Sequence, residues 1–425
     1  MPPCYCVAPH DSARLEPNSC LSLMNDVQQQ TSHLWLPFTQ MRDFDRASRT
    51  FVRGEGNELF DARGKGVFDA VSSIWTIVHG HCHPAIVEAI ARQAARLDHA
   101  TLLGATNPVA ERLAERLCAL TGLDYAFFAG DGASAIEAAL KMAIQYWQHR
   151  GQPQRTRFVR LVDAYHGDTA GAMSLSDIAA FRSRFGALTF ETLPYDLAGE
   201  FGSDVAAVVV EPLVQAAAGM RLVPAALYQN LKNIAPLLIV DEIATGFGRT
   251  GTMFAFESLG LRPDLACVGK GLTGGALALS ATLAHERVYE AFLGARGDAV
   301  QFFHGHSYAG NPIACAAALA SLDLFQSEAT LQRVASLSSL AARRLDAMRR
   351  LPAVRETRQA GLMIGVELQR DAQPGEAGAR VAAGLYERGH FTRPIGDVVQ
   401  FVPPLSSTEA QVNAFFDALA AELAA

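Results

Sequence analysis

The stretch ACVGKGLTGG, residues 266–275, decides the fold because it places a lysine between an apolar strand and a glycine-rich turn. Lys270 has no partner there for its charge and little room. Upstream, LLIVDEIATGFGRTG (237–251) ends another apolar run at Asp241, where a carboxylate is costly unless it meets a cation. Together the two residues suggest pyridoxal phosphate. Lys270 would hold its aldehyde as a Schiff base, and Asp241 would keep the pyridine nitrogen protonated.

Each residue alone has a simpler interpretation. A lysine after a strand is usually a surface residue, and an aspartate there is usually a turn or helix cap. Neither GKGLTGG nor GFGRTG fits the P-loop pattern or the dinucleotide fingerprint. A nucleotide site is therefore not expected.

Composition limits the classes of partner. Half of the 425 residues are apolar, which allows one large and one smaller domain. The 36 basic and 43 acidic residues give a net charge of −7, and no block of basic residues is present in the sequence. No apolar run reaches membrane-spanning length, and the N-terminus lacks signal-peptide features. We expect a cytoplasmic protein with reduced cysteines, no nucleic-acid partner and no membrane partner, whose residues 1–32 form a flexible extension.

Strands and helices alternate between residues 158 and 270, which predicts an α/β fold with a parallel sheet covered on both faces. Polar residues follow the strands at the edge where such sheets bind ligands. These residues are Tyr165, His166, Glu211, Asp241 and Lys270. We expect a large domain over 76–325 and a small α+β domain over 326–425, to which 33–75 contributes.

Three further positions suggest ligand contacts. Gly132 precedes a strong helix, so its free amides could bind phosphate, although a glycine cap is the commoner explanation. Tyr165 could lay its ring on a cofactor or be a buried structural tyrosine. Arg393 could hold a carboxylate with both nitrogens or be a surface arginine.

Two histidine groups raise the question of a metal: His79, His81 and His83 in HGHCHP, and His304 and His306 in HGHS. No carboxylate accompanies them at ligand spacing, and the neighbouring Gly and Pro residues indicate loops. We expect no metal site. A metal-dependent hydrolase and a non-catalytic scaffold are the alternatives from other classes, and a scaffold has no need for a lysine beside a buried acid.

A series of motifs over residues 33–425 resembles the class III aminotransferases of fold type I. The motifs are HLWLPFTQM (33–41), DAVSSIWTIVHGHCHP (69–84), GDGASAIEAALKMAIQYW (130–147), AYHGDTAGAMS (164–174), VVVEPLVQAAAGM (208–220), the two stretches quoted first, HGHSYAGNP (304–312) and TRPIGDVV (392–399). The resemblance implies pyridoxal 5'-phosphate as cofactor and a mostly parallel seven-stranded sheet between helices in the large domain.

The resemblance also assigns roles residue by residue. Lys270, Asp241 and Tyr165 would be catalytic, and the cofactor would contact Gly132, Ala133, Tyr165, His166, Glu211, Asp241, Ile243 and Lys270. Ser307 would reach the cofactor phosphate of a second subunit, which implies a homodimer with shared sites. Phe38, Trp75, Arg249 and Arg393 would bind substrate, with Asp168 nearby.

Within the family, the motifs resemble the branch that acts in biotin biosynthesis. Its members transfer an amino group, by a ping-pong Schiff-base route, from lysine or S-adenosylmethionine to 8-amino-7-oxononanoate, giving 7,8-diaminononanoate. The alternative is an ω-amino-acid or diamine aminotransferase that uses pyruvate or 2-oxoglutarate. The chain departs from the family's sequence pattern at three places that bear on substrate or phosphate binding. These are Asp131 in the phosphate loop, the stretch at 191–208, which is shorter than in the family, and Ile74, where members that use S-adenosylmethionine carry a second Trp. Ile74, HGHSY and LLGATN favour the lysine-using branch.

Overall fold

The computed structural model of the chain describes residues 33–44, 49–195, 201–232, 234 and 236–424. The expected extension at 1–32, with Cys4, Cys6 and Cys20, lies outside the described residues. So does part of the shortened stretch, residues 196–200.

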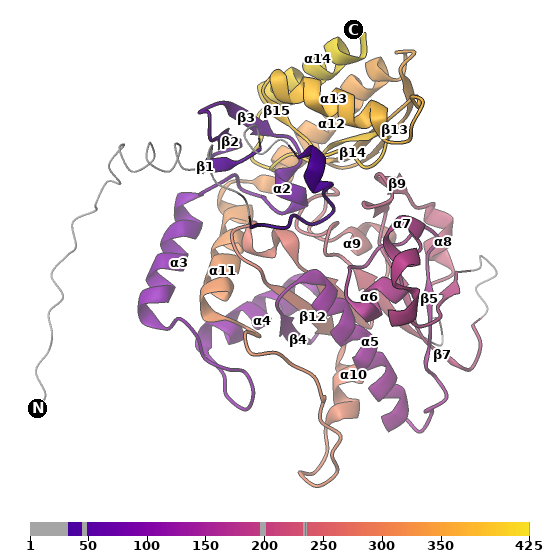
Figure 1. The fold of residues 1–425 in the computed structure, drawn as a ribbon. Coiled ribbons are helices and arrows are strands. Elements are labelled where there is room, and N and C mark those ends of the chain that lie inside the picture. The colour runs from indigo at the N-terminus through magenta and orange to yellow at the C-terminus, as the bar shows by residue number, and fades with distance from the viewer. Residues whose placement is uncertain (1–32, 45–48, 196–200, 233, 235, 425) are drawn as a thin grey trace, which may run out of the picture.

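The centre of the fold is a seven-stranded sheet (Figure 1). Only β12 runs antiparallel to its neighbours, so the predicted mostly parallel sheet is confirmed. The strands, in sheet order, are β4 Tyr125–Ala129, β12 Ser280–Ala284, β11 Leu265–Val268, β10 Leu237–Asp241, β7 Val205–Val210, β5 Arg157–Arg160 and β6 Leu193–Pro194. All six side chains of β7 are buried, as expected for a strand covered on both faces.

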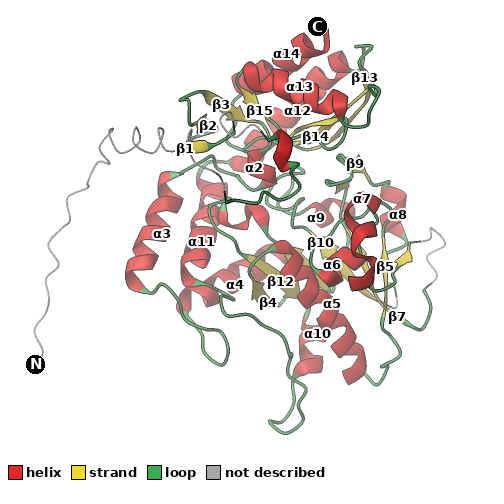
Figure 2. Cartoon of the chain, viewed as in Figure 1, coloured by secondary structure: helices red, strands yellow, loops and turns green. Residues whose placement is uncertain are grey.

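Helices surround this sheet (Figure 2). Proline or a capping side chain marks the start of three of the longer helices: Pro84 in α3, Asp131 before α5 and Asn311 before α11. The helices here are α3 Pro84–Arg96, α4 Pro108–Thr121, α5 Gly132–His149, α6 Ala170–Ser174, α7 Ala179–Arg182, α8 Ala225–Gln229, α9 Ala255–Leu259, α10 Glu286–Tyr289 and α11 Pro312–Ser327. The 3-10 turns of this part are η2 Ser183–Leu188, η3 Lys270–Thr273 and η4 Glu290–Phe292. A small hairpin is formed by β8 Val214–Gln215 and β9 Arg221–Leu222.

The C-terminal hundred residues form a second layer above the large sheet in Figure 1. An antiparallel sheet of β13 Val354–Ala360, β14 Met363–Leu368 and β16 Val398–Phe401 is accompanied by α12 Thr330–Met348, α13 Glu376–Glu387 and α14 Glu409–Ala424. The aromatic rings of Phe401, Phe415 and Phe416 pack together in its core.

Residues from the N-terminal part join this layer through a mixed sheet. It contains β1 Phe51–Glu55, β2 Glu58–Asp61, β3 Gly66–Asp69 and, parallel to β3, β15 His390–Phe391. The turns η1 Met41–Asp43 and α2 Ser72–Trp75 flank it in the sequence. The domain boundaries at residues 75 and 325 stay predictions. No helix in the described part of the chain is long and apolar enough to cross a membrane.

Candidate active site

The carboxyl ends of the parallel strands open onto one cavity of about 460 Å³. Asp241 ends β10 beside Cys267 of β11, and Lys270 follows β11, so the sheet brings this acid and this amine to the same edge. The lining comprises nine of the predicted site residues, namely Trp75, Gly132, Ala133, Tyr165, His166, Glu211, Asp241, Ile243 and Lys270, together with Asp131, Gly167, Asp168, Thr169, Ala216, Ala217, Ala244 and Thr245.

Lys270 presents a free amine to this cavity. Its Nζ has no hydrogen bond or ion pair with any described residue and lies 5.3 Å from the centre of the Trp75 ring. Its backbone adopts a left-handed φ of 42°, which is costly for a residue with a side chain and is found most often at functional sites. Burial lowers the pKa of the Lys270 amine, although Asp241 and Glu211 act in the opposite direction. A lowered pKa makes the neutral, nucleophilic amine more available.

Asp241 is held rigidly by two donors. Its Oδ2 is 2.7 Å from Nδ1 of His166, and its Oδ1 accepts the backbone N–H of Ile243 at 3.0 Å. Burial lowers the pKa of His166, but the hydrogen bond and the charge of Asp241 outweigh it, so the pKa is raised overall. The Nε2 atom of His166 is buried and has no partner among the described residues. The pair therefore offers an oriented, buried carboxylate.

Tyr165 and Glu211 form a second polar pair. The Tyr165 N–H donates to Oε2 of Glu211 at 3.0 Å, and its hydroxyl donates to Oδ2 of Asp168 at 2.9 Å. Burial raises the pKa of Tyr165, and Asp168 adds to this effect, so the hydroxyl keeps its proton. Burial likewise raises the pKa of Glu211 to about 7. The tyrosine is thus fixed at both its backbone and its hydroxyl.

The start of α5 forms one end of the cavity. Asp131 caps this helix, since its side chain accepts from the Ser134 N–H at 3.0 Å and the Ser134 hydroxyl at 2.9 Å. A Cβ atom at Gly132 would lie 2.8 Å from Cγ2 of Ile243, so any other residue here would have to displace the Ile243 side chain. The amides of the first helical turn have no intrahelical acceptor and face the cavity with the positive end of the helix dipole. The Asp131 departure is therefore accommodated: its carboxylate is occupied by capping.

Phe38 and Arg393 line a second cavity, of about 710 Å³. The Arg393 guanidinium lies 6.0 Å from the centre of the Phe38 ring. The ring of Phe181 lies between one lining residue of each cavity, since it contacts Phe38 at 5.4 Å and Tyr165 at 5.6 Å between centroids. Phe181 could not be predicted from the sequence, because the four-residue helix that carries it gives no periodic signal.

Two predicted site residues lie outside both cavities. Arg249 is 1% exposed and donates to the carbonyl oxygens of Pro403 and Ile77, so its side chain ties the loop after β10 to two distant segments instead of lining either cavity. Ser307 is exposed on the loop between η4 and α11. The role predicted for Ser307 is a contact with the cofactor phosphate of a second subunit, and this role stays a prediction.

The first histidine group is dispersed among different partners. His79 bonds Ser321, His81 bonds Asp69 and His83 bonds Glu328. Within the described residues, no group of three or more His, Cys, Asp or Glu side chains is arranged to hold a metal.

The buried Glu211 gives a prediction about stability. Because its folded-state pKa of about 7 is raised above the ordinary 4.5, the folded protein holds this proton more tightly, and stability is lost as the pH rises from about 4.5 through 7. Glu211→Gln imitates the protonated form and removes that loss. Above pH 7 the cofactor-free variant should exceed the parent by up to about 3 kcal/mol, and below pH 4.5 the two should agree.

Thermal and urea unfolding across this pH range measures the difference. Glu115→Gln, at an exposed position on α4, is the control and should show no pH-dependent gain. A Glu211→Gln variant that is less stable than the parent at high pH would contradict the assignment of a buried, weakly acidic carboxyl.

The chain matches the aminotransferase class III family over residues 40–423 and belongs to that family. It is an aminotransferase with the fold type I architecture. The adenosylmethionine-8-amino-7-oxononanoate aminotransferase of Geobacter sulfurreducens is 40% identical, over 91% of this chain and 94% of that protein.

Two solved structures extend this similarity. The adenosylmethionine-8-amino-7-oxononanoate aminotransferase of Methanocaldococcus jannaschii superposes with a TM-score of 0.88 at 38% identity, covering 95% of this chain and 99% of that chain. An amine transaminase from an uncultivated Pseudomonas species, solved with pyridoxal phosphate bound, has a TM-score of 0.86 at 31% identity, covering 93% and 99%.

Proposed function

We propose that this aminotransferase binds pyridoxal 5'-phosphate at Lys270 and transfers an amino group from lysine or S-adenosylmethionine to 8-amino-7-oxononanoate, giving 7,8-diaminononanoate. The observation that carries the proposal is the free Lys270 amine at the same sheet edge as the Asp241–His166 pair. The names of the relatives at about 40% identity support the acceptor.

The residues present fit this cofactor at three points. Lys270 has no described partner, so its Nζ is available for covalent attachment. Asp241 is anchored by His166 and Ile243 and can accept from a protonated ring nitrogen. Gly132 and Ala133 offer amides for a phosphate at the start of an 18-residue helix. When bound, the cofactor supplies an aldehyde carbon and a ring that withdraws electrons from the carbon being deprotonated.

The chain's own residues then control protons and water. Lys270 Nζ takes the proton from the amine-bearing carbon of the donor and, in the second half of the cycle, delivers a proton to the acceptor carbon that gains the amino group, a task suited to an amine with a lowered pKa. Asp241 stays oriented throughout because His166 and a backbone amide hold both of its oxygens. Trp75, 7% exposed, covers Lys270 and excludes water from it.

Arg393 is the proposed contact for the acceptor's carboxylate. Its side chain is exposed and forms no ion pair with any described residue, and Phe38 lies beside it to pack against an alkyl chain. An arginine can hold a carboxylate through two parallel hydrogen bonds. Such a clamp suits an acceptor with an acid at one end and a reacting carbonyl further along.

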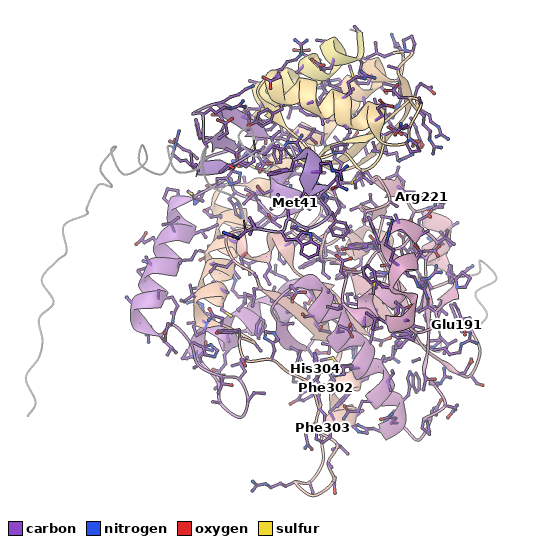
Figure 3. All side chains as sticks on the ribbon, in the orientation of Figure 1. Met41, Glu191, Arg221, Phe302, Phe303 and His304 are labelled. Carbon is purple, nitrogen blue, oxygen red and sulfur yellow. The ribbon has the colours of Figure 1, made fainter. Side chains whose placement is uncertain are left out.

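We also propose that two copies of the chain share their sites. Phe302, Phe303 and His304 lie on the long loop that extends away from the sheet between η4 and α11 (Figure 3). Phe303 and Tyr308 of this loop are 62% and 68% exposed, and so is Leu103 at 68%, which lies near Gly305. These apolar groups favour a subunit contact that would bring Ser307 to the partner's phosphate.

A substrate screen tests the proposed reaction. The cofactor-loaded enzyme is given 8-amino-7-oxononanoate with lysine or with S-adenosylmethionine, and mass spectrometry measures 7,8-diaminononanoate. One of these donors should give a kcat/KM at least about 100-fold above β-alanine or putrescine with pyruvate. Turnover of pyruvate alone, without any diamine from the oxononanoate, would assign the chain to the ω-amino-acid or diamine enzymes instead.

A further inference from the structure

A buried carboxamide connects Trp75 to Arg393. Gln400, on β16, is 1% exposed. The indole Nε1–H of Trp75 donates to Oε1 of Gln400 at 2.9 Å, and Nε2 of Gln400 donates to the backbone carbonyl of Arg393. One side chain therefore joins a residue that covers Lys270 to the residue proposed to hold the acceptor's carboxylate.

The side-chain amide of Gln400 matches the chemistry of both partners. An indole nitrogen only donates a hydrogen bond and a backbone carbonyl only accepts one. The bridging group must therefore accept at one end and donate at the other. A methionine or leucine of similar size offers neither, and an asparagine is shorter by a methylene. The backbone of Gln400 is fixed as well, because its carbonyl accepts from the Thr392 hydroxyl at 2.7 Å.

Trp75 lies at the end of a costly backbone turn. Ser72, Ser73, Ile74 and Trp75 have φ values of 50°, 46°, 65° and 68°, a full turn in the left-handed region without glycine. Each such residue costs about 1–2 kcal/mol, so the turn needs tertiary contacts. Ser73 bonds Asp69 at one end of the turn, and the Trp75–Gln400 bond holds the other.

Arg393 is fixed at its backbone and free at its guanidinium. Gln400 and the neighbouring Thr392 hold the strand, whereas the charged end faces the cavity shared with Phe38. The distance between Lys270 and the backbone that carries the Arg393 guanidinium is thus set by the contacts that run from Lys270 through Trp75 and Gln400 to Arg393.

We infer that Gln400 is a positioning residue that fixes the span between the reacting amine and the carboxylate clamp. The enzyme thereby selects acceptors whose carbonyl and terminal carboxylate are separated by a set length of chain. The inference rests on the proposed function, since it presumes an acceptor with a terminal carboxylate.

Gln400→Met tests the inference by steady-state kinetics. The KM for 8-amino-7-oxononanoate should rise about tenfold, the equivalent of one lost hydrogen bond, while kcat changes by less than about threefold. Gln359→Met is the matched control. Gln359 also donates to two backbone carbonyls in the small domain, those of Ser338 and Gly361, and not to the carbonyl of Arg393, so the KM of Gln359→Met should stay within about twofold of the parent.

A double-mutant cycle separates positioning from general damage. Trp75→Phe removes the indole donor of the same bond and keeps a smaller aromatic ring at this position, so the KM of Trp75→Phe/Gln400→Met should match the larger single effect. Effects that multiply, or a fall in kcat without a change in KM, would overturn the inference.

Fluorine NMR of 5-fluorotryptophan-labelled protein provides a readout that needs no turnover. The chain has three tryptophans, and Trp75→Phe identifies the resonance of Trp75. That resonance should shift in Gln400→Met and not in Gln359→Met. An unmoved resonance in a folded Gln400→Met protein would overturn the inference. A shifted resonance in an enzyme that aminates no oxononanoate would instead reject the proposed function and leave the Trp75–Gln400 contact standing.

Discussion

Lys270→Ala should lower transamination by a factor on the order of 10⁴ while leaving the protein folded. The side chain has no hydrogen bond or ion pair with the described residues, so its removal costs little stability. Its loss removes both the covalent attachment point and the base at the reacting carbon. Single-turnover reactions with each donor measure the rate, and circular dichroism checks the fold.

The control for this variant is Lys232→Ala, an exposed lysine that lines neither of the two proposed site cavities. It should keep full activity. If Lys270→Ala retained more than about a tenth of the parent rate, the role assigned to this amine would be wrong.

Asp241→Asn should lower the rate by a factor on the order of 10²–10³, the usual cost of losing one preorganised electrostatic contact. An amide is neutral and cannot meet a protonated ring nitrogen as a carboxylate does. The substitution also weakens the contact with Nδ1 of His166. A carboxylate presents a negatively charged oxygen to this nitrogen, whereas an amide presents either a neutral oxygen or an NH₂ group. The half-reaction rate with a saturating donor is the measurement.

Asp264→Asn is the matched control. This buried aspartate directly precedes β11, at the end of the strand away from Lys270, where it accepts hydrogen bonds from the Leu238 N–H and from Arg287. It should leave kcat unchanged even if the protein loses stability. Equal losses of kcat in the two variants would mean that Asp241 supports the fold and not the chemistry.

The site residues could be predicted from the sequence where they directly follow the ends of parallel strands. Apolar runs that end in Asp241, Glu211 and Gly269–Lys270 predict a common sheet edge, because parallel strands bring their carboxyl ends together. The structure places these side chains around one cavity. The capping role of Asp131 is also predictable from the sequence, since an aspartate directly before a strong helix is a common N-cap.

Other features depend on contacts between segments far apart in the chain. Gln400 lies in the run VVQF, which reads as an ordinary core strand, and its partner Trp75 is 325 residues away. No residue type marks the left-handed turn before Trp75, because tertiary contacts and not glycine support it. Likewise, His83 meets Glu328 from 245 residues away, so the carboxylate that accompanies it cannot be found from local spacing.

Reductive trapping tests the central claim most directly. The chain has four lysines, Lys65, Lys141, Lys232 and Lys270. After incubation with pyridoxal phosphate and reduction with borohydride, peptide mass spectrometry should find the phosphopyridoxyl group on Lys270 in nearly stoichiometric amount and at background level on the other three. A label spread over the other lysines, or none on Lys270 in folded protein, would contradict the account.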